Sequence, residues 1–431
     1  MIAKTPEPAP VHSAAHHRMA FFRQSGWMMI AATAGGAFMY CVHPIASRGM
    51  PKDEYGVFTA LLQVISLMGI PAGGLQMIFA QQVAAAITEE QRRLVISTFK
   101  RVLQGIFCIW VLIAVVVAIF WKQAAAGLQL SNPAALAASV GVGLSALMMP
   151  TVLGMMQGRQ NFLWLGWANI LNGVGRFLAV CVVVLLLHGW AAGTMCAVFL
   201  GMTGAVVIGI WQVRDVWRTA IVKVAWGEWL GRAVPLTLGF GVATFMLSAD
   251  MIFVQHFFPR EQTGFYAAAG MIGRALVFFT QPLTLVMFPK IAHSAARAEK
   301  TDALALALGI TALAGAAVAV GCTLFPSLPL RIVYDKSFLE VATPLVPWFA
   351  WCMLPLTLAN VLINALLARG KFAVVPWLVA VAIGYGVALA NFHESFKMVI
   401  QTLGVCSTLL FLVCAWFTWG VKDKAKLAGG K

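Results

Sequence analysis

The chain has 431 residues, of which 61% are hydrophobic and only 10% are charged, and its formal net charge is +15. Soluble domains carry about a quarter charged residues, so the composition excludes a water-soluble globular protein and predicts an all-α polytopic membrane protein. The eight cysteines show no zinc-ligand or redox-motif spacing, and we expect them to be small buried residues.

The polar, proline-containing residues 1–24 are expected to be a cytoplasmic N-terminal tail that leads into a retained first helix. Apolar segments long enough to cross the hydrocarbon core follow along the rest of the chain. We predict twelve of them, at 25–46, 57–87, 102–121, 134–156, 162–187, 190–211, 233–257, 264–289, 303–325, 342–367, 373–392 and 398–419.

The loops between these spans alternate in their content of Lys and Arg. Of the 30 such residues, 21 fall on the side of the N-terminal tail and seven on the other side. Positive residues concentrate on the cytoplasmic side, so both termini are predicted to be cytoplasmic. Anionic lipid headgroups account for the basic balance, and we expect no nucleic-acid partner.

Short phrases recur along the chain at a nearly constant offset. Gly56 and Gly264 are 208 positions apart, and Phe162 and Phe372 are 210 apart. Six spans per copy is an even number, which predicts two parallel six-helix repeats that form an N-lobe and a C-lobe around a central cavity. The expected boundaries are 25–213 for the N-lobe, 214–232 for a cytoplasmic link, 233–419 for the C-lobe and 420–431 for a cytoplasmic tail.

The clearest repeated phrases are "DEYGVFTAL" at Asp53–Leu61 and "EQTGFYAAA" at Glu261–Ala269. Each precedes a long apolar run on the predicted outer side. We expect their acids to lie in exposed turns, and we expect Gly56 and Gly264 to let the chain bend there.

Only three formal charges lie well inside predicted spans, namely Arg176, Asp250 and Arg274. Charges in the membrane are costly and mark either a functional site or an ion pair. Asp250 and Arg274 lie at similar depths, so a buried pair between neighbouring helices is one alternative and substrate or coupling chemistry is the other. Arg176 has no acidic candidate, which favours a substrate contact facing the cavity.

Several further polar residues are candidates for the same cavity. Asn169 and Asn172 share a helical face with Arg176, and Asn360 and Asn364 form a similar pair in the tenth span. These amides indicate either substrate contacts or hydrogen bonds between helices. Arg23 and Arg232 occupy equivalent cytoplasmic positions in the two repeats, where they can anchor the helices or capture an anion, and His43 is a candidate for proton coupling.

Motifs of catalysis are missing from the sequence. It contains no Walker A segment, no HExxH, no nucleophile elbow and no His/Cys/carboxylate cluster. We therefore expect no enzyme activity, no cofactor and no metal site.

The order and spacing of several motifs resemble the multidrug/oligosaccharidyl-lipid/polysaccharide exporter superfamily. The residues that carry the resemblance are "EYGVF", "TGFYAAA", "LSADMIFVQHFF", "FPKIA", "QGRQNF" and "ARGKF". The pattern is most similar to the polysaccharide-transporter or O-antigen flippase branch, and it covers nearly all of the chain after the tail.

This resemblance implies a bacterial inner-membrane protein with two lobes that alternate between inward-open and outward-open states. The implied substrate is an undecaprenyl-diphosphate-linked oligosaccharide, which crosses the membrane for polysaccharide biosynthesis, and a polysaccharide polymerase or synthase is an implied partner. The planar guanidinium of arginine suits a diphosphate. Two alternatives stay open: a cation-coupled multidrug exporter in which Asp250 couples transport, and a non-transporting membrane scaffold of a polysaccharide synthase.

Overall fold

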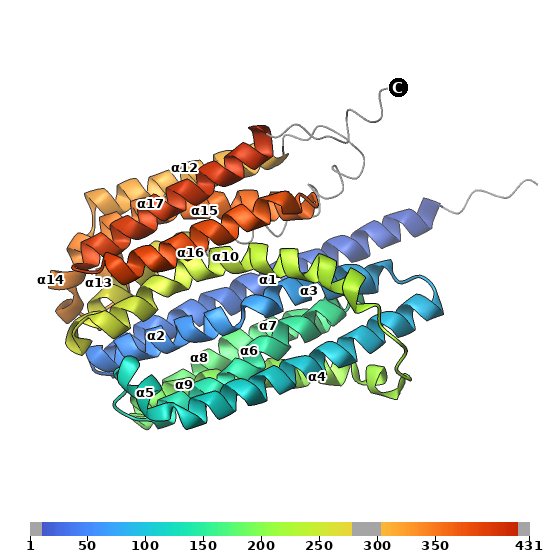
Figure 1. Ribbon diagram of the computed structural model, residues 1–431, viewed down its shortest axis with the longest axis horizontal. Coiled ribbons are helices and arrows are strands. Elements are labelled where there is room, and N and C mark those ends of the chain that lie inside the picture. The colour runs from blue at the N-terminus through green and yellow to red at the C-terminus, as the bar shows by residue number, and fades with distance from the viewer. Residues whose placement is uncertain (1–10, 278–302, 421–431) are drawn as a thin grey trace, which may run out of the picture.

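A computed structural model describes residues 11–277 and 303–420, with backbone only for 11–26, 29 and 303. All regular secondary structure in these residues is helical. The long helices run side by side as one bundle, with α12, α15, α16 and α17 forming one group and the helices of the first half another (Figure 1). The prediction of an all-α fold is confirmed.

The first half of the chain forms the part drawn from blue to green in Figure 1. Its helices are α1 (Val11–Gly49), α2 (Lys52–Met68), α3 (Ile70–Ala85), α4 (Glu89–Ile119), α5 (Trp121–Gly127), α6 (Ala134–Gly158), α7 (Phe162–Ile170), α8 (Arg176–Cys181) and α9 (Trp190–Gln212).

The second half begins with α10 (Trp226–Phe257) and continues in a helix over residues 260–277. Its remaining helices are α12 (Ala303–Leu324), α13 (Ser327–Val333), α14 (Leu339–Ala342), α15 (Val346–Ala368), α16 (Val375–Asn391) and α17 (Phe396–Ala415).

Nine helices of the described residues are long and apolar enough to cross a membrane, or ten if α2 and α3 are one bent span. The predicted second span is this bent pair: α2 and α3 meet at Gly69 with an angle of 45° between them. Pro71 near the start of α3 lacks a backbone N–H, which explains the break. The described residues do not establish the predicted count of twelve, because the eighth predicted span is described only to residue 277.

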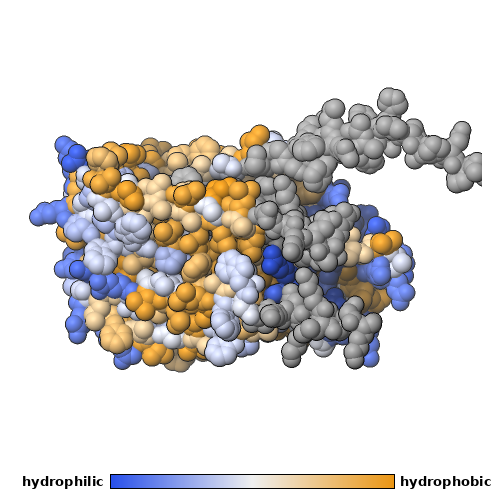
Figure 2. All heavy atoms as spheres, turned by 90° about the horizontal axis from the view of Figure 1, so that it is seen from above, coloured by the Kyte–Doolittle hydropathy of each residue, from blue (hydrophilic) through white to orange (hydrophobic). Residues whose placement is uncertain are grey.

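The bundle has the surface of a membrane protein. Hydrophobic residues cover its middle and hydrophilic residues gather at its two ends (Figure 2). On α4 the side chains of Ile109, Leu112, Val115 and Ile119 are all exposed. Lipid is the solvent that suits such a face, and we describe the chain as a multi-pass integral membrane protein.

The two halves pack against each other along α2, α3 and α10. A Cβ on Gly74 of α3 would come within 2.6 Å of Thr237 Cα in α10, so only glycine allows this approach. Toward the start of α10, the Trp229 indole N–H donates to the Gln82 side-chain oxygen over 3.3 Å. The halves therefore touch along much of the bundle.

The expectation for the two repeated phrases is wrong. Residues 52–61 and 261–269 lie inside α2 and inside the helix 260–277, and neither phrase forms a turn. Glu54 is only 3% exposed, whereas Glu261 is exposed. Helices begin directly at Lys52 and Arg260, so the two glycines lie within the first turns of helices and do not bend the chain.

Candidate functional site: the buried charges between the two halves

Arg176 is held by an irregular part of the fifth predicted span. A π-helical turn at Leu171–Gly175 separates α7 from α8, which begins at Arg176. π-Helical turns are rare, and they are frequent at functional sites. Arg176 is 8% exposed and forms no ion pair with any described residue, and its Nε has no hydrogen-bond partner. The first half thus holds a buried guanidinium whose charge has no acidic partner.

The amides beside Arg176 are only partly engaged. Asn169 donates to the Leu165 carbonyl of its own helix over 2.8 Å. Asn172 is buried, its amide nitrogen lies 3.7 Å from Met39 Sδ, and its Oδ1 has no partner. Gly35 of α1 permits this packing, since a Cβ there would lie 2.7 Å from the Asn169 carbonyl oxygen. A buried amide oxygen without a partner favours an additional ligand.

Asp250 and Arg274 form the ion pair that the sequence left open. Arg274 Nη2 donates to both carboxylate oxygens of Asp250 over 2.7 Å. Asp250 is 0% exposed and Arg274 is 3% exposed. The Tyr266 hydroxyl donates to Asp250 over 2.8 Å, and Arg274 Nε donates to the Leu247 carbonyl over 2.9 Å. The Asp250 carboxylate therefore has three hydrogen bonds, whereas Nη1 of Arg274 has no partner among the described residues.

His43 joins the two halves through a chain of hydroxyl groups. Its Nδ1 lies 3.1 Å from the Tyr55 hydroxyl, which lies 2.9 Å from the hydroxyl of Tyr334 in the second half. His43 thus lies at the boundary of the halves.

The remaining predicted residues stay predictions. Asn364 donates to the Asn360 carbonyl over 2.7 Å, so this pair is bonded within α15. Arg232 is exposed in the first turns of α10, and Arg23 lies in α1 where its side chain is outside the described residues. Among the described residues, no hydrogen bond joins the α15 amides to Arg176, His43 or Arg274.

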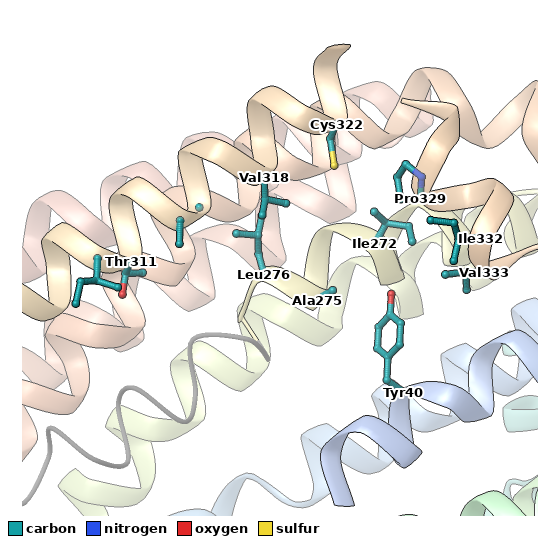
Figure 3. Close-up of a pocket in the computed structure, with 13 residues that line it drawn as sticks. Tyr40, Ile272, Ala275, Leu276, Thr311, Val318, Cys322, Pro329, Ile332 and Val333 are labelled. Carbon is teal, nitrogen blue, oxygen red and sulfur yellow. The ribbon is translucent and has the colours of Figure 1, made fainter. Parts of the chain in front are cut away.

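A cavity of about 440 Å³ lies between α1, the helix 260–277, α12 and α13. Tyr40 of α1 points into it, facing Ile272 and Ala275, with Val318 and Cys322 of α12 on the far side (Figure 3). The lining is almost entirely apolar, and neither Arg176 nor Arg274 contributes to it. The cavity at this boundary of the halves is therefore apolar, and it does not contain the polar residues that the sequence indicated as candidates.

Sequence reasoning missed the tyrosines that complete the site. Three of them are buried, namely Tyr55, Tyr266 and Tyr334. The Tyr55 hydroxyl lies within hydrogen-bond distance of His43 and of the Tyr334 hydroxyl, and the Tyr266 hydroxyl donates to Asp250. A signal was present, because the sequence has only five tyrosines and two of them lie in the repeated phrases. Across the part of the chain described here, no three His, Cys, Asp or Glu side chains form a metal-binding group.

The arrangement of the helices defines a class of fold, which is shared with solved membrane flippases and exporters. The structure aligns with the lipid II flippase MurJ in its inward closed conformation (TM-score 0.71, 12% identity, 93% of this chain and 88% of that chain). It also aligns with an inward-facing MATE multidrug resistance transporter of the MOP superfamily (TM-score 0.67, 12% identity, 94% and 96%). A MOP superfamily transporter from Pyrococcus furiosus aligns less closely (TM-score 0.54, 13% identity, 93% and 94%).

The sequence itself identifies the family. Residues 21–294 match the family described as "Polysaccharide biosynthesis protein", and the chain belongs to it. No protein of curated function matches the sequence. The resemblance stated from the motifs is thereby confirmed at the level of family and fold.

Proposed function

We propose that the protein is a flippase that moves a polyprenyl-diphosphate-linked oligosaccharide from the cytoplasmic to the outer leaflet of the bacterial inner membrane. The observation that carries the proposal is the buried Arg176, which has no acidic partner among the described residues. A buried cation without a counter-ion is costly unless an anion occupies the site during function. A diphosphate supplies that anion, and the planar guanidinium binds phosphate oxygens in pairs.

The family and the shape of the site support this substrate class. The chain belongs to a polysaccharide biosynthesis family, and a lipid II flippase has the same fold. The apolar cavity beside Tyr40 suits a prenyl chain better than a glycan, because it offers almost no hydrogen-bonding groups for sugar hydroxyls. On this proposal Asn169 and Asn172 contact the head group, both termini are cytoplasmic, and a polysaccharide polymerase or synthase is the partner.

The test uses purified protein in liposomes that contain a fluorescent polyprenyl-diphosphate oligosaccharide. Arg176→Met keeps most of the side-chain volume and removes the charge. We expect it to slow flipping on the order of 100-fold, since loss of one partner of a desolvated charged contact costs about 2–5 kcal/mol. The exposed Arg101→Met in α4 is the matched control and is expected to flip at the wild-type rate.

Because Arg176 has no partner to lose, the thermal unfolding midpoint of Arg176→Met should stay at or above that of the wild type. Wild-type flipping by this variant would contradict the diphosphate site. Absence of flipping by the wild type would instead favour the scaffold alternative. Movement of a cationic drug in the same liposomes, lost on Asp250→Asn, would favour the multidrug exporter.

A further inference from the structure

The end of the bundle opposite the N-terminus of α1 carries an ionic contact between the halves. We call this end the distal end; it contains the α1–α2 junction, α5, α13 and α14 (Figure 1). Glu54 of α2 is 3% exposed, and Arg260 of the second half donates to it through Nη2 over 2.5 Å. Arg260 also lies 3.2 Å from Asp53. One arginine of the second half thus binds two acids of the first.

Glu54 is also anchored within its own half. The Ser131 hydroxyl donates to the carboxylate oxygen that Arg260 contacts, and the Ala191 backbone N–H donates to the other oxygen over 3.1 Å. The carboxylate is therefore fixed within its own half, next to the starts of α6 and α9, and Arg260 is its partner from the other half. Charged hydrogen bonds of this kind are the stronger ones in proteins.

Directly beside this ion pair, the two repeated phrases touch each other. A Cβ on Gly56 would lie 2.1 Å from Thr263 Oγ1 and 3.0 Å from the Gly264 backbone nitrogen, while a Cβ on Gly264 would lie 2.2 Å from the Lys52 carbonyl oxygen. The two glycines occupy equivalent positions of the repeat and face each other. Equivalent positions contact each other only near a two-fold axis, so the pseudo-symmetry axis of the halves passes through this point.

The ion pair itself is not repeated by this symmetry. The position equivalent to Arg260 is Lys52, which donates to the Ser337 carbonyl over 3.1 Å, and the position equivalent to Glu54 is Gln262, which carries no charge. In the described part of the chain, the symmetric contact between the two glycines is therefore accompanied by an ion pair on one side only. Movement of the two halves away from each other at this end must separate Arg260 from Glu54 before the distal end opens.

We propose that Glu54 and Arg260 are gating residues: together with the Gly56–Gly264 contact they form a latch that holds the distal end closed, and its release opens that end. The proposal concerns the conformational equilibrium of the protein and requires no particular substrate. It gives the two repeated phrases a common role, since each contributes one glycine and the chain around it to the same closure.

Hydrogen–deuterium exchange of the full-length protein in lipid nanodiscs tests the latch without any transport assay. Glu54→Gln removes the charge of the buried acid. We expect exchange in peptides covering residues 50–62 and 258–268 to rise about tenfold, the factor that corresponds to loss of a charged hydrogen bond at the lower end of its range. Glu261→Gln is the matched control, because it removes an exposed acid of the equivalent phrase, and its exchange should equal that of the wild type.

Two further variants separate a latch from general stabilisation. Gly264→Ala places a methyl group against the Lys52 carbonyl and should open the same peptides, whereas Gly73→Ala in α3 meets no atom within 4 Å and should not. The double variant Glu54→Gln/Arg260→Gln should exchange no faster than the single variant Arg260→Gln, because Arg260→Gln alone already removes the contacts with Glu54 and Asp53. Unchanged exchange in Glu54→Gln would overturn the proposal, and so would an increase spread over α16 and α17. Either result leaves the Arg176 experiment unaffected.

Discussion

Arg176 and Arg274 are both buried arginines in the membrane part of the protein, and their surroundings differ completely. Arg274 is bound to both oxygens of Asp250 and to a backbone carbonyl, whereas Arg176 has no acid within reach among the described residues. Burial alone therefore does not reveal the role of a charge in a membrane. Arg274 is bound within the second half, and on the proposed function Arg176 of the first half is the arginine that binds an anion.

The largest effect on stability is expected when the acid of the Asp250–Arg274 pair is removed. Asp250→Leu leaves Arg274 as an uncompensated buried charge, and we expect a loss of about 3–5 kcal/mol in the free energy of unfolding. Thermal unfolding of the detergent-solubilised protein, followed by size-exclusion chromatography, measures the effect. The double variant Asp250→Leu/Arg274→Met should recover most of the lost stability.

If Asp250→Leu unfolded at the wild-type midpoint, the pair would contribute nothing to the fold, and the contrast between the two arginines would disappear. The same stability measurement on Arg176→Met provides the reference from the first half, where no partner is left behind.

The contrast between the two arginines was partly predictable from the sequence, because charged residues are rare within its apolar spans. Three charges within apolar spans stand out in any reading, and the absence of a nearby acid for Arg176 was already visible. The contact between Glu54 and Arg260 could not be predicted in the same way, because 206 positions separate them and only the packing of the halves brings them together. One signal was present: Glu54, Phe58 and Leu61 share a helical face, so an acid lay on an otherwise apolar stripe.

The membrane-spanning helices were predictable from the length and hydrophobicity of the segments. The breaks and close contacts that involve glycine and proline were less predictable. The break at Gly69 and the π-helical turn before Arg176 follow from local backbone detail that a count of apolar residues does not register. Gly56 and Gly264 were interpreted as bends because glycine favours turns. Their actual use is close contact between helices, which depends on a neighbour far away in the chain.

A smaller loss of stability is expected when one hydrogen bond to the Asp250–Arg274 pair is removed. Tyr266→Phe removes the hydroxyl that donates to Asp250 and should lower the free energy of unfolding by about 1–3 kcal/mol, because the carboxylate loses one of its buried hydrogen bonds. Tyr385→Phe is the matched control: this tyrosine is equally buried, and its hydroxyl has no partner. Equal midpoints for the two variants would show that the Tyr266 hydroxyl does not support the pair.

The smallest effect is expected for a third arginine, Arg159, whose partner Asp215 lies outside the spans in the turn after α9. The two side chains meet at 2.7 Å, and that of Asp215 is 62% exposed. Partial burial opposes ionisation of Asp215, but the hydrogen bond and the charge of Arg159 outweigh it and lower the carboxyl pKa below its ordinary value of 3.8. A lowered acid pKa contributes stability above the unfolded-state pKa, and this contribution is lost as the pH falls through the folded-state pKa.

Unfolding midpoints measured between pH 7 and pH 3 should therefore show a slightly less stable Asp215→Asn variant at neutral pH, by less than about 1 kcal/mol, and convergence with the wild type at the acid end. A gap that widened on acidification would have the wrong sign for this pair. A partly buried arginine whose partner is exposed thus contributes little to stability, and a fully buried arginine with a partner contributes more. On the proposed function, the buried arginine without an acidic partner binds the substrate.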